Sequence, residues 1–228
     1  VYKRQVLELD HYSLGGPIAY SSGSSPVRLA PYNSLWDAEL DQLSNYNTGG
    51  TGYAGSSITL QRHGGPDASD VFGASGNLSF SDGKAYWRAM RYDDYSGTPT
   101  DHEIGTVSNS DGVLTLTFTQ GSSPNFYFEV SNALASISYS NSNTNARGPV
   151  VIDVTFNEGP NGGAVDPEPP LSVTKSTTVQ LLDGLPGGIE DTAYRVSLAE
   201  LVNGWTEADP TGLSLSHLSA AYATIAGP

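Results

Sequence analysis

Residues 150–156 have the sequence Val-Val-Ile-Asp-Val-Thr-Phe, in which every even-numbered position is apolar. Successive side chains of a β-strand point to opposite faces of a sheet, so this pattern predicts a strand with one buried and one exposed face. Similar alternation occurs in 112–119, 126–130 and 56–60, and Gly, Asn, Asp, Ser or Pro bounds each run. Such boundaries are typical of turns. The sequence therefore predicts an all-β fold, an antiparallel β-sandwich.

Helical patterns are few in this chain. Trp36, Leu40 and Leu43 lie at helical spacing behind Ser34, a suitable N-cap, which predicts a short helix over 34–43. A second short helix is predicted over 131–137. A third is predicted over 197–204, which begins with a capping Ser and ends with Gly.

The clearest boundary lies between Asn157 and Pro170, where Gly, Asn, Asp and Pro replace the periodic pattern. The segment Pro-Glu-Pro-Pro at 167–170 is expected to be stiff and extended. We therefore expect a ligand-binding β-sandwich domain over 1–158, a Pro/Gly linker over 159–170, and a cadherin-like module over 171–228. Because a seven-stranded sandwich needs roughly 90–100 residues, the last module is expected to be partial.

The composition excludes several classes of function. The 228 residues include 10 Lys and Arg against 24 Asp and Glu, a formal charge of −14. This charge opposes binding to nucleic acid and to anionic membrane surfaces. No stretch approaches the roughly 18–20 apolar residues of a membrane span, so we expect no direct membrane insertion. The N-terminal Val-Tyr-Lys-Arg begins no apolar run of signal-peptide type, which favours an excised piece of a longer chain.

The acidic residues crowd into short, turn-rich segments. Like charges repel unless a cation lies between them, and ten basic side chains cannot partner all the acids. Calcium accepts irregular cages of oxygen ligands, and it is abundant outside the cell, which favours an extracellular protein. The alternative is that the acids are solvated loop charges. The candidate calcium ligands are Asp37, Glu39, Asp41, Asp67, Asp70, Asp93, Asp94, Asp101, Glu103, Glu190, Asp191 and Asp209.

Two of these groups have a second interpretation. Asp37, Glu39 and Asp41 would share one side of an extended segment, which suits oxygen ligation. In a helix, Asp37 would instead be a capping acid and Asp41 a surface charge. Asp67 and Asp70 follow a Gly-Gly turn, where Asp is also favoured because it forms Asx turns.

The segment 84–101 is the best candidate for ligand binding. Aromatic side chains, which are enriched where a surface binds a partner, alternate here with arginines and acids. A calcium ion held by the acids with an open coordination position would let this acidic domain bind a carboxylate. Alternatively, the first two aromatics belong to the core of an ordinary hairpin and the adjacent acids to a solvated turn. The candidate ligand-binding residues are Tyr86, Trp87, Arg88, Arg91, Tyr92, Asp93, Asp94, Tyr95 and Asp101.

Catalytic patterns are missing from the sequence. The four His residues lack the close pairing of a zinc site, and there is no Cys. Neither a Gly-Xaa-Ser-Xaa-Gly motif in a strand-turn-helix context nor a phosphate-binding loop occurs. A glycosidase needs two carboxylates in different environments, whereas the acids of 84–101 resemble metal ligands. We therefore expect that the protein is not an enzyme.

Specific phrases link the C-terminal part to a known family. They are Glu190-Asp191-Thr192-Ala193-Tyr194, Leu198-Ala199-Glu200-Leu201-Val202-Asn203-Gly204-Trp205-Thr206-Glu207-Ala208-Asp209 and Leu213-Ser214-Leu215-Ser216. These phrases resemble the opening half of the cadherin-like calcium-binding repeats of bacterial RTX adhesins. Residues 210–212 depart from the pattern because they lack a second loop acid.

Further phrases occur in the first domain. They are Val6-Leu7-Glu8-Leu9-Asp10, Pro26-Val27-Arg28-Leu29-Ala30-Pro31, Asp37-Ala38-Glu39-Leu40-Asp41, Gly52-Tyr53-Ala54-Gly55, Leu60-Gln61-Arg62-His63-Gly64-Gly65-Pro66-Asp67-Ala68-Ser69-Asp70-Val71-Phe72 and Ile137-Ser138-Tyr139-Ser140-Asn141. They resemble another module of the same adhesins, and with the segment 84–101 the domain resembles their calcium-dependent peptide-binding domain.

The resemblance implies a function for this chain. It implies a monomeric module of a much larger protein on the bacterial surface, which serves cell adhesion and biofilm formation. The expected partner is a short peptide with a free C-terminal carboxylate, held by Ca²⁺, on a target-cell protein. Two alternatives stay open: a calcium-stabilised carbohydrate-binding module that takes a glycan, and a structural spacer repeat of the same adhesin.

Overall fold

The computed structural model describes residues 5–8, 17–43, 52–89, 98–119, 126–163 and 169–182. The chain divides into two compact units, Val1–Gly184 and Leu185–Pro228, and every described residue belongs to the first. The helix predicted over 197–204 and the candidate ligands Glu190, Asp191 and Asp209 therefore lie outside the described residues.

The largest element of the described residues is one sheet of eight strands, in the order β2-β13-β12-β5-β10-β9-β8-β7. Neighbouring strands are antiparallel except β13 and β2, which are parallel. The strands predicted over 56–60, 112–119 and 150–156 are confirmed as the central strands. The bounds are β2 Ile18–Ser21, β5 Ser57–Arg62, β7 Leu78–Ser81, β8 Lys84–Ala89, β9 Thr100–Ser110, β10 Val113–Phe118, β12 Gly148–Asn157 and β13 Ser172–Leu182.

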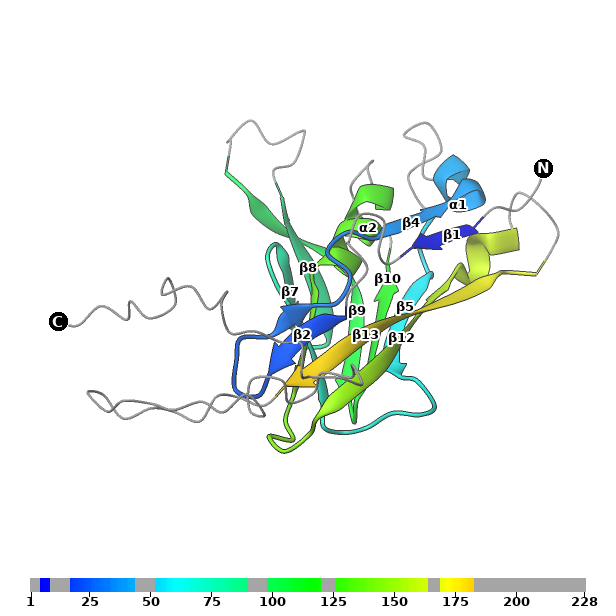
Figure 1. Ribbon diagram of the computed structural model, residues 1–228. Helices are drawn as coiled ribbons and strands as arrows, with labels where there is room; N and C mark the ends of the chain where they lie inside the picture. The colour runs from blue at the N-terminus through cyan, green and yellow to red at the C-terminus, as the bar shows by residue number, and fades with distance from the viewer. Residues whose placement is uncertain are drawn as a thin grey trace, which may run out of the picture. The chain divides into compact units, whose positions relative to one another are not determined.

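Two small sheets and three helical segments complete the described part of the first unit. A three-stranded sheet has the order β3 (Val27–Arg28), β11 (Ile137–Asn141) and β6 (Asp70–Ala74), and β1 (Gln5–Glu8) pairs with β4 (Ser34–Asp37). The helical segments are α1 (Ala38–Leu43), α2 (Phe126–Ala135) and the 3₁₀ helix η2 (Gly159–Gly163). Figure 1 shows α1, β1 and β4 gathered near one end of β5 and β12.

The core lies between the eight-stranded and three-stranded sheets. Ile152, Val154 and Phe156 of β12 are fully buried, as their alternation predicts. From the three-stranded sheet, Phe72 and Tyr139 pack against each other with ring centroids 5.9 Å apart, and both belong to the same core. Because the apolar faces of the two sheets share one core, the predicted all-β sandwich is confirmed.

Two local predictions were wrong because tertiary packing overrides short patterns. Residues 126–130, predicted as a strand, form the first half of α2. Val130, Ala133 and Leu134 are buried at the spacing of one helix face, so helical periodicity continues through the segment. Near residue 34 the expected helix begins with a strand instead, since 34–37 pairs with β1 and α1 begins only at Ala38.

The pairing of β13 corrects the predicted domain boundary. β13 pairs with β12 from Ser172–Asn157 to Leu181–Gly148, and it also pairs with β2. The segment 159–170 is therefore a connection between two strands of one sheet rather than a linker between domains. Loss of periodicity marked this connection correctly, but periodicity alone does not show whether the chain returns to the same sheet. The boundary between compact units falls after Gly184.

Candidate functional site

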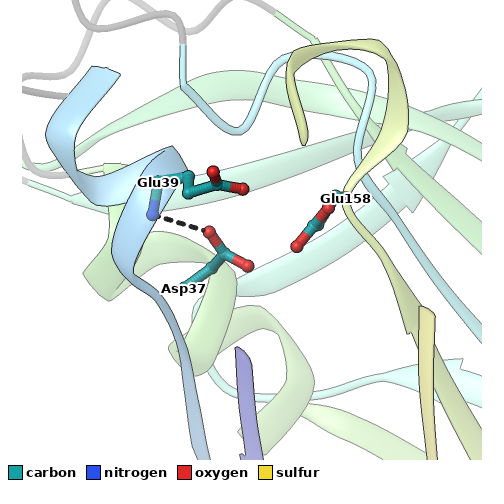
Figure 2. Close-up of side chains that lie close together, drawn as sticks. All are labelled: Asp37, Glu39 and Glu158. Atoms are coloured by element: carbon teal, nitrogen blue, oxygen red, sulfur yellow. Dashed lines mark hydrogen bonds between the residues drawn. The ribbon is translucent and has the colours of Figure 1, made fainter. Parts of the chain in front are cut away.

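Three buried carboxylates meet where β4, α1 and the end of β12 come together. Asp37, Glu39 and Glu158 are 1%, 2% and 1% exposed. One carboxylate oxygen from each lies within 4.8 Å of the other two. Figure 2 shows the three side chains directed toward a common space. We call these three residues the acid cluster.

The start of α1 orients Asp37 and Glu39. Oδ1 of Asp37 accepts hydrogen bonds from the backbone N–H groups of Glu39 and Leu40, both at 2.9 Å. Asp37 therefore caps the helix, a role the sequence offered as an alternative to calcium binding. Its interpretation as part of an extended segment with Glu39 and Asp41 is corrected, because only Asp37 belongs to a strand. Capping and membership of the acid cluster occur together.

A close backbone approach positions Glu158. Gly159 has a φ of +69°, and a Cβ atom there would lie 2.2 Å from the carbonyl oxygen of Gly55. The Asn161 side chain then donates hydrogen bonds to the Gly52 and Ala54 carbonyls at 3.2 and 3.0 Å. These contacts hold the turn at 52–55 against η2. The backbone of Glu158 is thereby fixed beside α1.

Glu158 also joins the acid cluster to the next strand. Its Oε2 accepts a hydrogen bond from the backbone N–H of Leu171, the residue before β13. The Glu158 N–H in turn donates to the Leu171 carbonyl at 3.1 Å. The acid cluster thus lies at the point where the chain leaves β12 and where it enters β13.

A fourth acid, Asp41, lies close enough to the acid cluster for the charge of Asp37 to affect its pKa. The hydroxyl of fully buried Tyr53 donates to Oδ1 of Asp41 at 2.7 Å. Burial raises the pKa of Asp41; the Tyr53 hydrogen bond opposes this rise, and the nearby charge of Asp37 adds to it. Burial, followed by the charges of Asp41 and Asp37, raises the pKa of Tyr53. Asp41 is therefore not the solvated surface charge that a helical segment was expected to give.

The donor set of the acid cluster suits a hard divalent cation. Calcium takes six to eight oxygen ligands at about 2.3–2.6 Å, so two oxygens on one ion lie at most about 5 Å apart. The spacing of the three carboxylates falls within this limit. Burial disfavours adjacent like charges strongly, and a bound cation relieves that cost. The chemistry and spacing of these residues thus fit Ca²⁺, with backbone oxygens or water available to complete the shell.

Asp67 and Asp70 have a different environment. Arg62 donates from Nε and Nη2 to the two oxygens of Asp70, both at 2.7 Å, and its Nη1 lies 2.9 Å from Asp67. Tyr139 and Asn141 also donate to Asp70, at 2.7 and 2.9 Å. Arg62 thus balances the charge of buried Asp70, and the more exposed Asp67 also contacts the same guanidinium. The argument from unbalanced charge that predicted calcium here therefore does not apply to Asp70.

The predicted ligand-binding segment forms part of a hairpin of β8 and β9. Trp87 packs against the core, as the alternative interpretation of this residue held. Tyr86 neighbours it in the strand and is partly exposed, so the alternation places it on the opposite face. Arg88 and Asp101 are about half exposed, and their ion pair is long, at 3.5 Å. Of the predicted residues, Arg91, Tyr92, Asp93, Asp94 and Tyr95 lie outside the described residues.

Glu103, another candidate calcium ligand, forms an ion pair. Nζ of Lys84 lies 2.6 Å from its Oε2, and both side chains are exposed. The hydrogen bond and the charge of Glu103 raise the pKa of Lys84. Across the described part of β8 and β9, each candidate acid thus faces a basic side chain.

The sequence did not identify Glu158. It is separated from Glu39 by more than a hundred residues, and no other acid occurs within four positions of it. The one feature of the sequence that could have pointed to Glu158 is its position directly after a strongly alternating strand. Similarly, nothing in the sequence assigned Arg62 to Asp70, although the two residues flank one Gly-Gly turn.

Comparison with known proteins identifies one family. The model of the family described as "Putative Ice-binding-like adhesive domain" matches residues 9–181. A solved structure, AggA, the major subunit of aggregative adherence fimbriae type I from Escherichia coli, is 13% identical, with a TM-score of 0.28. That match covers 81% of this chain and 97% of AggA, and its TM-score is too low to support a structural relationship. No curated protein matches the chain. None of the helices in the described ranges is long and apolar enough to cross a membrane.

Proposed function

This chain belongs to the Ice-binding-like adhesive domain family, and from that premise we propose that it is a calcium-dependent adhesin module of a bacterial surface protein. An adhesive domain binds a partner without transforming it, which agrees with the lack of catalytic motifs in the sequence. The observation that carries the calcium dependence is the acid cluster, with three buried carboxylates within 4.8 Å of one another.

Calcium at the acid cluster would have a structural role. Asp37, Glu39 and Glu158 would hold the ion, and the ion would place a positive charge among three buried carboxylates. Because Glu158 also contacts the start of β13, the ion would connect α1 to the crossover between β12 and β13. A cation that binds only the folded state stabilises it by mass action.

The proposed ligand is a short peptide with a free C-terminal carboxylate, bound at the β8–β9 hairpin. Tyr86, Arg88 and Asp101 lie on one side of this hairpin, with Arg88 opposite Asp101 in the strand register. The long, exposed ion pair between these two is weak and exchangeable. A second calcium held by Asp101, with Asp93 and Asp94, would receive the peptide carboxylate beside Arg88. Tyr86 would contact the rest of the peptide.

Paired peptides test the proposed ligand. A library of short peptides with free carboxylates is compared with the same peptides amidated, by fluorescence anisotropy in calcium. Free peptides should bind and amidated ones should not, and Asp101→Asn should weaken the binding. Asp111→Asn is the matched control, because Asp111 occupies an exposed turn with a φ of +52° that Asn also adopts. Equal binding of free and amidated peptides would refute carboxylate capture.

A further inference from the structure

The outward face of the eight-stranded sheet carries two rows of polar side chains in direct register across the strands. The first row crosses seven strands, β13 to β7, and five of its seven members carry hydroxyl groups: Ser172, Asn157, Ser57, Thr117, Thr106, Lys84 and Ser81. The second row crosses five strands, and all five members carry hydroxyl groups: Thr174, Thr155, Thr59, Thr115 and Ser108. We call the two rows the hydroxyl face.

Strand alternation places the hydroxyl face opposite the core. In β5, Ile58 and Leu60 are fully buried while Thr59 between them is partly exposed. In β10, Leu114 and Leu116 are buried while Thr115 is partly exposed. At the sides of the sheet, the row members in β13, β9, β8 and β7 are exposed. The two rows are thus continuous and accessible.

Hydrogen bonds between neighbouring threonines arrange this face. The hydroxyls of Thr59 and Thr115 lie 3.2 Å apart, and those of Thr155 and Thr174 lie 2.8 Å apart. A hydroxyl has one donor and two acceptor sites, so each pair keeps a donor and acceptors for a further partner. Thr side chains are also stiff at χ1. Binding of a ligand to these side chains therefore costs little conformational entropy.

Charge narrows the class of ligand. The chain carries −14, yet the two rows contain one ionisable group, Lys84, which pairs with Glu103 at 2.6 Å. In the next row along β12, Asp153 is bound by Ser176 at 2.6 Å and His63 at 2.9 Å. An anionic polymer would be repelled by the net charge of the chain, and a cationic one would find few free charges on this face. A neutral ligand rich in hydroxyl groups is the complement.

The shape of the sheet favours a polymer over a flat lattice. Adjacent strands are about 4.8 Å apart and rotate by roughly 20–25° relative to one another, so rows across several strands follow a curve. Ordered water or ice would need a planar array, whereas a linear saccharide can follow the curve through its glycosidic linkages.

We propose that the hydroxyl face binds a neutral, linear polysaccharide lying across the strands. This site extends onto the β8–β9 hairpin but uses other residues than the peptide site there, and it needs neither the acid cluster nor a calcium ion. The domain would then have two adhesive surfaces: one for the carboxylate of a peptide and one for the hydroxyl groups of a glycan.

The test uses dextran, mixed-linkage β-glucan and galactomannan as neutral probes, and alginate as an anionic one. Binding is measured by affinity electrophoresis and calorimetry, with calcium and after chelation. At least one neutral polysaccharide should bind in both conditions, and alginate should not. The double variant Thr59→Val/Thr115→Val keeps the β-branched shape and should weaken that binding roughly tenfold or more. Thr144→Val, in an exposed turn, is the matched control and should bind like the wild type.

Four outcomes would overturn the proposal. The first is that none of the three neutral polysaccharides binds to the folded wild type. The second is that the double variant, with a wild-type circular dichroism spectrum, binds as tightly as the wild type. The third is thermal hysteresis or self-association that the double variant abolishes while polysaccharide binding stays unchanged, which would assign the face to ice or to a second copy. Loss of binding only after chelation would also contradict a calcium-independent site.

Discussion

Two buried acidic sites in this domain differ in the residues that compose them. Asp70, 2% exposed, is held by a two-pronged interaction with Arg62 and by two further hydrogen bonds. The acid cluster instead brings three buried carboxylates within 4.8 Å of one another. The first site pairs a carboxylate with a guanidinium, whereas the second groups three carboxylates, which is the composition of a cation site. Local crowding of acids in the sequence does not distinguish the two cases.

The largest change in unfolding free energy is expected when Arg62, the cationic partner of Asp70, is removed. Arg62→Met leaves Asp70 buried without its cationic partner, which should cost about 3–5 kcal/mol of unfolding free energy. Urea unfolding measures this loss, and calcium should not restore it. Arg28→Met, on an exposed position of β3, is the control and should be nearly neutral. A loss below about 1 kcal/mol for Arg62→Met would mean that Asp70 is not held mainly by Arg62.

A smaller change in unfolding free energy is expected when the pH of the calcium-free protein is lowered. At Asp41 this change should be stabilising. The folded-state pKa of Asp41 is raised, chiefly by burial, so the folded state binds a proton more readily than the unfolded state. The contribution of Asp41 to stability therefore increases as the pH falls through its folded pKa. The pKa of Asp67 is lowered, first by the Ser69 backbone hydrogen bond and then by its other partners. The contribution of Asp67 to stability should therefore decrease as the pH falls through its folded pKa.

Comparison of Asp41→Asn with the wild type isolates this contribution. Without calcium, the variant should be more stable than the wild type at neutral pH, and the advantage should shrink toward about pH 4. Urea unfolding at several pH values gives the difference. A pH-independent difference would show that Asp41 does not titrate differently in the folded and unfolded states.

The smallest effect on stability is expected at the hairpin. Arg88 and Asp101 are about half exposed and 3.5 Å apart, so Arg88→Met should change the unfolding free energy by less than about 0.5 kcal/mol. The same variant should weaken the binding of a free-carboxylate peptide measurably. Thermal unfolding and anisotropy on one sample separate the two effects. A large loss of stability would make this pair structural, unlike our assignment.

Strand patterns predicted the sheet well because burial on one face imposes a period of two. Ile58, Leu116 and Phe156 all lie where their alternation placed them. The same rule failed at 126–130, where the helical face that begins with Val130 decides the structure. It also could not show that β13 returns to the sheet, since pairing partners depend on contacts between distant segments.

The candidate site was predicted only in part for the same reason. Asp37 and Glu39 belong to one local pattern, and the sequence predicted both as calcium ligands. Glu158 joins them only through the fold, by way of the close approach of Gly159 to Gly55. The ion pair of Asp70 with Arg62 is likewise a contact between β5 and β6 rather than a motif. Sequence predicts which residues can bind a cation, and packing decides which of them meet.

The most direct test of the acid cluster compares the melting temperature of wild type and Glu158→Gln with excess calcium and after chelation. Glu158→Gln keeps the size of the side chain and removes one charge. At a hundredfold excess over its dissociation constant, calcium should raise the wild-type melting temperature by about 5–10 °C. The variant should show a clearly smaller rise, and calorimetry should find one calcium fewer. Equal rises in the two proteins, or no rise in the wild type, would contradict a calcium site at Asp37, Glu39 and Glu158.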